Sequence, residues 1–434
     1  MMSGLPSFHD SHWAAVTPPG SPYPTLKGEI AADTVVIGAG FTGLSTALHL
    51  AERGVSVVVV EAVEPGYGAS GRNNGQVIPT LTRMDPDDLI AKHGEAGDRF
   101  ADLVRDSAEI LFNLVRKHDL AAEAEQTGWM QPAHTPGRIK ISEKRFRQWE
   151  KRGAPVAMLS KAEMATMTGS DIWHGGFWNR SGGHINPLAL AREMARKVVE
   201  LGGAIYARSP VDRYFRDGDT WVVVTPQGRV KARALVLATH SYSAEFSADL
   251  QPKIAREVVP VLSWQMATQP LGDNLRKTII PGRQAVSDTH GDLYFMRYDA
   301  RNRLVTGGAL VVPFNGHKRL KLRIAERLQR IFPEIGEMTF SHVWNGYIGM
   351  TDDYCPRLHQ LGPNAYTWAG CNGRGVALGV ALGREFAAAV TGTPLNQLAM
   401  PLTDIKPLPF HGVVRRLAPL MLLEYRRRDA TEIA

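Results

Sequence analysis

The stretch that decides the fold is ADTVVIGAGFTGLSTALHLAERGVSVVVVEA, residues 32–62. It opens with a short β-branched apolar run at 35–37, typical of a buried strand, and closes with a second such run at 57–60. Between them, apolar residues recur at helical spacing from Leu44 to Ala51, and Gly54 ends that helix. Because both strands are apolar throughout, we expect them to be parallel. The stretch therefore predicts a βαβ unit.

Three glycines in the turn between the first strand and the helix follow the pattern GxGxxG. Gly38 permits a tight turn, Gly40 lets the backbone approach a diphosphate, and Gly43 lets the helix pack closely on the strand. The unpaired N–H groups at the helix N-terminus favour phosphate. Glu61 ends the second strand, at the distance along the chain where a carboxylate binds ribose hydroxyls. The unit therefore predicts a dinucleotide-binding, Rossmann-like domain.

Two further glycine-rich stretches favour FAD over NAD as the dinucleotide. In GYGASGRNNGQ, residues 66–76, Ser70 and Arg72 are polar partners for phosphate or ribitol, although a flexible surface loop is the alternative. Residues 370–383 are dense in glycine and run into an apolar helix, whose N-terminus could stabilise negative charge on a reduced flavin. The four-residue spacing of its glycines could equally serve close helix packing.

Four more motifs extend this pattern over nearly the whole chain. They are VLATHSYS (236–243), RLVTGG (303–308), WNGYIGMTDDYCPRL (344–358) and GCNGRGVALG (370–379). With these motifs in this order, the chain resembles the D-amino acid oxidase-like family of FAD-dependent oxidoreductases, above all its gamma-glutamylputrescine oxidase-like branch. The resemblance implies an α/β fold, with a Rossmann-like FAD-binding domain and a second α+β substrate domain on a largely antiparallel sheet.

The expected division of the chain follows from the same reading. Residues 30–84, 150–245 and 335–395 form the FAD-binding domain, residues 85–149 and 246–334 the substrate domain, residues 1–29 an extended lead-in, and residues 396–434 a basic helical tail. Patterning also predicts helices over 86–118, from Asn186–Pro187 to Leu201, and over 320–332, and strands at 204–207, 220–225, 229–238 and 304–312.

When the FAD-binding positions of the family are transferred to this sequence, the resemblance implies FAD contacts in several segments. The residues are Gly38, Gly40, Phe41, Thr42 and Gly43; Glu61 and Ala62; Ser70, Gly71, Arg72, Asn73, Asn74, Gly75 and Gln76; Val211, Thr239 and Gly346; and Gly373, Arg374, Gly375 and Val376. His240 stands where the family usually has glycine, and we favour a structural role for it. The FAD is expected to be non-covalent, because Cys355 and Cys371 do not fall where a tethering cysteine would lie.

The resemblance also implies the chemistry, which is oxidation of a C–N bond in an amine or amino acid. A neutral amine transfers hydride to flavin N5, and the resulting imine hydrolyses in water. The expected substrate-side residues are Trp264, Tyr294, Arg297 and Tyr347. Arg297 could bind a carboxylate in a bidentate manner, with a surface salt bridge as the alternative. Each aromatic residue, taken singly, fits a core position better than a substrate cage.

Oxygen is the expected electron acceptor, although one feature opposes it. Several oxidases of the family keep a lysine near flavin N5, and Val305 and Thr306 stand in the matching strand here. An amine dehydrogenase that passes electrons to a quinone or another carrier is therefore the alternative. A non-catalytic FAD-binding subunit and an RNA-associated flavoprotein are readings from other classes, and no zinc site or other metal site is evident.

Charge and composition do not decide whether the protein binds a membrane, a nucleic acid or another protein chain. The 434 residues are 44% hydrophobic and carry a formal net charge of +7, with five arginines in the last twenty residues. The basic stretch 413–429 could rest on an anionic membrane, but docking onto the protein's own body is preferred. We expect no secretory signal in residues 1–15, no transmembrane helix, a cytoplasmic location and no nucleic-acid partner; an oligomer is possible.

Overall fold

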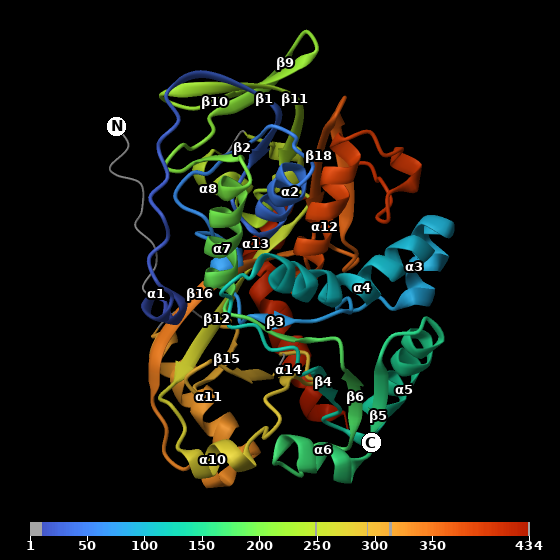
Figure 1. The fold of residues 1–434 in the computed structure, drawn as a ribbon. Coiled ribbons are helices and arrows are strands. Elements are labelled where there is room, and N and C mark those ends of the chain that lie inside the picture. The colour runs from blue at the N-terminus through green and yellow to red at the C-terminus, as the bar shows by residue number, and fades with distance from the viewer. Residues whose placement is uncertain (1–10, 248–249, 293, 312–314, 433–434) are drawn as a thin grey trace.

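The computed structural model describes residues 11–247, 250–292, 294–311 and 315–432. Two large sheets lie one above the other in Figure 1, and the helices pack on their faces and edges. We call the upper one the parallel-core sheet and the lower one the antiparallel sheet. A two-stranded ribbon of β3 (Gln76–Val77) and β7 (Gly183–His184) lies between them. The expected combination of a Rossmann-like domain with a second sheet is confirmed.

The parallel-core sheet is built around the predicted βαβ unit. Its strand order is β17 (Arg357–Gly362), β18 (Ala365–Ala369), β11 (Gly228–Leu237), β1 (Gly28–Ile37), β2 (Val57–Val60) and β8 (Ala204–Tyr206), and β10 (Thr220–Val224) and β9 (Arg213–Asp217) extend from β11. β1 pairs in parallel with both β2 and β11, as its uninterrupted apolar sequence predicts. The carboxyl ends of these strands therefore meet at one edge of the sheet.

Helices α2 (Phe41–Ala51) and α12 (Gly375–Val390) cross closely on this sheet. The Oγ of Ser45 donates a 2.7 Å hydrogen bond to the carbonyl oxygen of Val380. A methyl group at Gly383 would overlap the Ser45 side chain, and one at Gly379 would press on Thr42. The glycines of α12 therefore serve helix packing, which was one of the two readings of their spacing.

The antiparallel sheet is the main sheet of the second domain. Its order is β16 (Phe340–Met350), β12 (Val259–Thr268), β15 (Leu304–Gly308), β14 (Phe295–Tyr298), β13 (Ala285–Ser287), β4 (Trp129–Pro132), β6 (Gly176–Asn179) and β5 (Val156–Leu159). All its pairings are antiparallel except that between β13 and β4. β15 ends four residues earlier than expected, at Gly308, and residue 312 lies outside the described residues.

The remaining helices include several that the sequence did not predict, and α1 lies within residues 1–29, which were expected to be extended. They are α1 (His12–Val16), α3 (Pro86–His93), α4 (Glu95–His118), α5 (Pro136–Lys151), α6 (Lys161–Thr168), α7 (Pro187–Glu200), α8 (Ser243–Phe246), α9 (Pro252–Ala255), α10 (Asp273–Thr278), α11 (Gly316–Ile331), α13 (His411–Leu417) and α14 (Met421–Thr431). The side chain of Asn186 caps α7, as expected. The single helix expected over 86–118 is instead two helices, because Gly94 has a φ of +58° between them.

The expected domain division remains a proposal. Strands β5, β6 and β16 make their backbone hydrogen bonds in the antiparallel sheet, whereas the segments 150–245 and 335–395 were assigned to the FAD-binding domain. A division by sheets therefore moves 156–179 and 340–350 to the substrate domain. Their short, mixed patterns carry no signal for which sheet they join.

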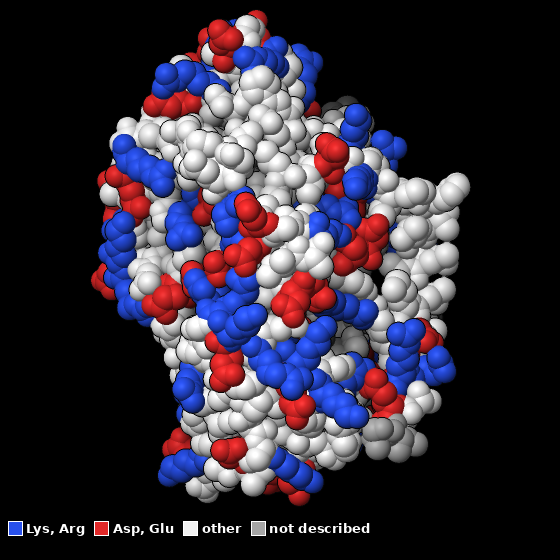
Figure 2. Space-filling view, turned by 90° about the vertical axis from the view of Figure 1, so that its right-hand side faces the viewer, with Lys and Arg blue, Asp and Glu red and all other residues white. Residues whose placement is uncertain are grey.

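The outer surface carries both signs of charge. On the face that presents α3, α4 and α5, basic and acidic side chains lie interspersed (Figure 2). On α4, Arg105 pairs with Asp102 and Asp106. No helix in the described part of the chain is long and apolar enough to cross a membrane.

Candidate functional site

The N-terminus of α2 forms the first part of the site. Gly38 has a φ of +104°, which only glycine adopts without strain, and it turns the chain sharply out of β1. A methyl group at Gly43 would overlap the carbonyl oxygen of Gly38, so glycine is required there for helix and strand to pack. Gly40 is the N-cap and offers no side-chain cap. The first backbone N–H groups of α2 are thus arranged as in a phosphate-binding turn.

Glu61 lies beside this turn at the end of β2. Its carboxylate accepts hydrogen bonds from the backbone N–H groups of Ala39 at 2.7 Å and Val63 at 3.0 Å. Burial raises the pKa of this carboxyl group above its ordinary value, and the backbone hydrogen bonds oppose the rise. Glu61 lines a small cavity of about 110 Å³. The other expected cofactor residues that line it are Gly38, Gly40, Ala62, Ser70, Val211 and Thr239.

The loop at 66–76 closes over α2. The Oγ of Ser70 accepts a 2.9 Å hydrogen bond from the N–H of Phe41, and Arg72 donates from Nε to the carbonyl oxygen of Tyr67 at 2.7 Å. One terminal nitrogen of Arg72 is buried without a hydrogen-bond partner. Gly71 and Gly75 line neither this small cavity nor the larger one described next; instead each allows a close backbone approach, to Gly66 and Ile185 respectively.

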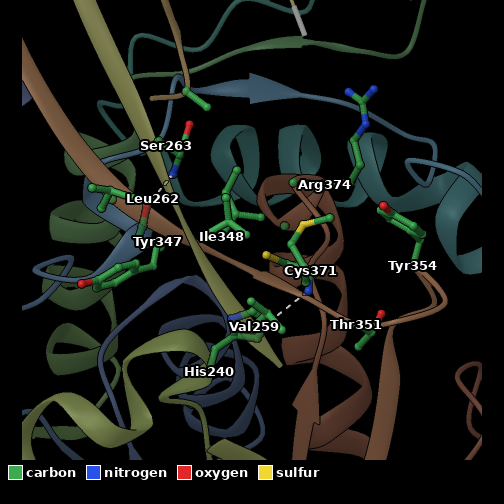
Figure 3. A pocket seen from close by; sticks show the side chains of 18 of the residues that line it. His240, Val259, Leu262, Ser263, Tyr347, Ile348, Thr351, Tyr354, Cys371 and Arg374 are labelled. Atoms are coloured by element: carbon green, nitrogen blue, oxygen red, sulfur yellow. Dashed lines mark hydrogen bonds between the residues drawn. The ribbon is translucent and has the colours of Figure 1, made fainter. Parts of the chain in front are cut away.

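A larger cavity of about 660 Å³ runs from this turn to the antiparallel sheet. The expected cofactor residues that line it are Gly40, Phe41, Thr42, Ser70, Arg72, Asn73, Asn74, Gln76, Gly346, Gly373, Arg374, Gly375 and Val376. Its opposite wall, formed by β12 and β16, is mainly apolar and includes Val259, Val261 and Ile348. In Figure 3, Ile348 and Val259 lie on the side of Cys371, whereas Leu262 and Tyr347 turn to the other side of the strands. The cavity thus joins a polar backbone turn to an apolar chamber.

His240 holds the glycine-rich loop in place. Its Nε2 accepts a 3.1 Å hydrogen bond from the N–H of Cys371, drawn in Figure 3, and its Nδ1 lies 2.8 Å from the Oγ of Ser241. Burial lowers the pKa of His240 to about 4, so the ring is neutral near pH 7. Its φ of +47° is a conformation that glycine favours. The contacts support the structural role favoured for His240.

The four expected substrate-side residues do not come together. Tyr347 lines the large cavity, but Trp264, Tyr294 and Arg297 do not. Trp264 points to the other face of β12, where it packs edge-on against His317, and Tyr294 stacks on His290. The alternation of side chains along β12 decides the orientation of Trp264, and a one-residue uncertainty in register was enough to reverse the expectation for it.

Arg297 is buried and its donors are already used. It donates to the carbonyl oxygens of Asn74, Tyr298 and Ile185 at 2.7–2.8 Å, and its guanidinium lies over the indole ring of Trp13. Neither the carboxylate nor the surface salt bridge considered from the sequence fits this environment. We therefore correct the expectation and assign Arg297 to tying the 66–76 loop to β14.

Arg374 is the cation that the cavity leaves available. Its side chain is 6% exposed and its guanidinium lies 4.8 Å from the ring centroid of Trp129 on β4. Among the described residues no acid acts on it, and its guanidinium contact is with the indole ring of Trp129. Burial, together with the neighbouring charge of Arg145, lowers its pKa to about 9. A buried cation without a partner is costly, which favours an anionic or carbonyl oxygen as its ligand.

Two groups of lining residues were missed from the sequence. Gln265 is 4% exposed, and its Oε1 is a buried acceptor without a donor, although its Nε2 donates to the Oγ of Ser263 at 3.0 Å. The C-terminal helices supply a further wall, consisting of Val414, Ala418, Met421, Leu422 and Tyr425. Their helical spacing was the available signal, but only the fold shows which face turns inward.

The residues present fit FAD. Glycine is required by close contacts in the first turn, and Glu61 stands at the end of β2. Beside the cavity, one buried terminal nitrogen of Arg72 lacks a partner, and Arg374 has no acidic partner among the described residues. Two adjoining cavities that share Gly40, Ser70 and His240 offer an extended path for a long cofactor. Contact of each individual residue with FAD stays a prediction.

Comparison with known proteins agrees with this geometry. Residues 33–389 match the family model described as DAO: FAD dependent oxidoreductase. The chain is 29% identical over 384 residues to the gamma-glutamylputrescine oxidoreductase of Escherichia coli (strain K12), with 88% of this chain and 89% of that protein covered.

Solved structures show the same fold. The glycine oxidase from Geobacillus kaustophilus has a TM-score of 0.71 and 19% identity, and the alignment covers 86% of this chain and 99% of that one. An L-amino acid deaminase from Proteus vulgaris has a TM-score of 0.72 and 20% identity, with 92% and 98% covered.

Proposed function

The chain belongs to the DAO family of FAD dependent oxidoreductases, and from this membership we propose that it oxidises a carbon–nitrogen bond of an amine held against the apolar wall of the large cavity. It is thus an FAD-dependent enzyme of a family that acts on amines and amino acids. The observation that carries the finer proposal is the continuity of the cavity from Gly40 at the start of α2 to β12 and β16.

The cofactor supplies the hydride acceptor when it is bound, and the protein supplies position and desolvation. An alkyl ammonium group has an ordinary pKa comparable to that of lysine, about 10. An apolar wall such as that of Val259, Val261 and Ile348 disfavours the charged form and so favours the neutral, reactive amine. The substrate domain therefore favours the neutral form of the amine mainly by excluding water.

The polar side chain of Gln265 is suited to orient the substrate. The free Oε1 of Gln265 can accept an N–H from the amine, since it is a buried acceptor without a partner. Tyr347 on the adjacent strand β16 also lines the cavity, but its ring turns to the other face of the strand and lies 5.4 Å from that of Tyr242, so it is the weaker candidate for substrate contact. Arg374 is placed to bind an oxygen of FAD or of the substrate. The FAD is proposed to be non-covalent.

The substrate to test first is an extended amine such as gamma-glutamylputrescine, which the name of the E. coli relative suggests. Oxygen is the proposed acceptor. A dehydrogenase that uses a quinone or carrier is the second candidate, and one observation favours it: no lysine is among the described residues that line the cavity.

The test is anaerobic bleaching of the flavin absorbance by a panel of amines and amino acids, followed by admission of air. Bleaching by an amine with hydrogen peroxide released in air supports the oxidase. Bleaching with slow reoxidation by air and rapid reoxidation by a quinone supports the dehydrogenase. If no amine or amino acid bleaches fully loaded protein, the proposal is wrong.

A further inference from the structure

The C-terminal residues 405–432, which we call the C-terminal strap, lie outside the matched range 33–389 and cross the mouth of the large cavity. Several polar contacts hold the strap to the body, among them a 2.8 Å contact of His411 Nε2 with the carbonyl oxygen of Val258. The hydroxyl groups of Tyr425 and Tyr354 lie 2.6 Å apart, Arg426 pairs with Asp292 at 2.9 Å, and Asp429 accepts from the N–H of Gly291. One face of the strap is therefore fixed against the protein.

The opposite face of the strap is apolar and exposed. Phe410 is 84% exposed and Leu417 is 53% exposed, and the spacing of the exposed residues follows a helical stripe. The stripe consists of Phe410, Val413, Leu417, Leu420 and Leu423. Val414 and Met421 are also exposed and line the cavity, so the apolar surface continues to its mouth. A contiguous apolar patch of this kind marks an interaction site.

Exposed basic side chains lie on the same segment as the apolar stripe. Arg415 and Arg416 are exposed and have no acidic partner in the part of the chain that the structure describes. Arg427 and Arg428 are also exposed, and both bond to the single acid Glu424, so this end keeps an excess of positive charge. Exposed apolar residues beside unpaired cations are the combination that binds an anionic lipid surface.

We propose that the C-terminal strap docks the protein on an anionic lipid bilayer, with the apolar stripe at the headgroup boundary and the arginines near lipid phosphates. A second copy of the chain fits this surface less well. In a two-fold interface the same patch meets itself, which brings the cationic strap of one copy against that of the other. On a bilayer, the cavity mouth at Val414 and Met421 lies next to the lipid. The inference does not depend on which amine is oxidised.

The test is flotation of FAD-loaded, full-length protein with vesicles of phosphatidylcholine alone and of phosphatidylcholine with phosphatidylglycerol. We expect binding to the anionic vesicles that weakens as salt is raised. Each arginine near an anionic surface contributes about a fivefold gain in the partition constant, so Arg415→Gln with Arg416→Gln should lower it about 25-fold. Leu417→Ser with Leu423→Ser should lower it about tenfold.

Leu322→Ser is the matched control, because Leu322 on α11 is 55% exposed but lies outside the strap. It should bind vesicles as the wild type does. Flavin content and anaerobic bleaching by an amine should stay unchanged in all these variants, which separates lipid docking from catalysis. Absence of binding to anionic vesicles would overturn the proposal, as would equal binding to both vesicle types. A stable lipid-free dimer that Leu417→Ser with Leu423→Ser disrupts, without vesicle binding, would assign the surface to a second copy instead.

Discussion

Replacing Arg297 by alanine should weaken the fold rather than the recognition of a substrate carboxylate. The guanidinium bonds to three backbone carbonyl oxygens, those of Asn74, Ile185 and Tyr298. Each buried group left without a partner costs about 1–3 kcal/mol, which gives roughly 3–9 kcal/mol in all. Burial of the cation, which lowers the pKa of Arg297 to about 10, offsets part of this loss. We expect the free energy of unfolding to fall by about 3 kcal/mol in Arg297→Ala.

A loss of this size is a large part of the stability of a typical domain, about 5–15 kcal/mol. The assay is urea unfolding followed by tryptophan fluorescence, with Arg301→Ala, an exposed neighbour on the following turn, as the control. Arg297→Lys should fall between the wild type and Arg297→Ala, because one ammonium group cannot serve all three carbonyl groups. The reasoning is refuted if Arg297→Ala unfolds at the wild-type urea concentration and loses activity only on substrates that carry a carboxylate.

Three further changes test the site. Gly43→Ala places a methyl group on the carbonyl oxygen of Gly38 and should abolish retention of FAD on gel filtration, whereas Gly272→Ala, with open space around it, should retain FAD fully. Burial depresses the pKa of His240 to about 4, which is below its value in the unfolded chain, so on acidification the unfolded chain is protonated at this residue before the folded protein is. The free energy of unfolding of the wild type should therefore fall by roughly 3 kcal/mol between about pH 6.5 and pH 4. Thermal melts of His240→Ala should not show this decrease in stability, and an identical pH dependence in both proteins would contradict the assignment. Gln265→Leu removes the free acceptor Oε1 and should lower kcat/KM for amines about five- to tenfold without loss of FAD; unchanged kinetics would exclude Gln265 from substrate binding.

The sequence alone determined the nucleotide-binding half of this protein. The apolar runs that became β1 and β2, the turn at Gly38 and the acid at Glu61 all lie within residues 32–62, so their geometry follows from local rules. Local signals of this kind act over a few residues and need no knowledge of distant contacts. The same holds for the cap of α7 by Asn186.

Only the tertiary structure decided which side chains share the substrate cavity. The orientation of Trp264 depends on strand register, and the role of Arg297 depends on carbonyl groups up to 223 positions away along the chain. The sheet that β5, β6 and β16 join, and the face of the C-terminal strap that turns inward, likewise follow from packing between segments far apart in sequence. A side chain's type sets what it can bind, but its surroundings, which the chain assembles from distant segments, decide whether its hydrogen bonds are already used.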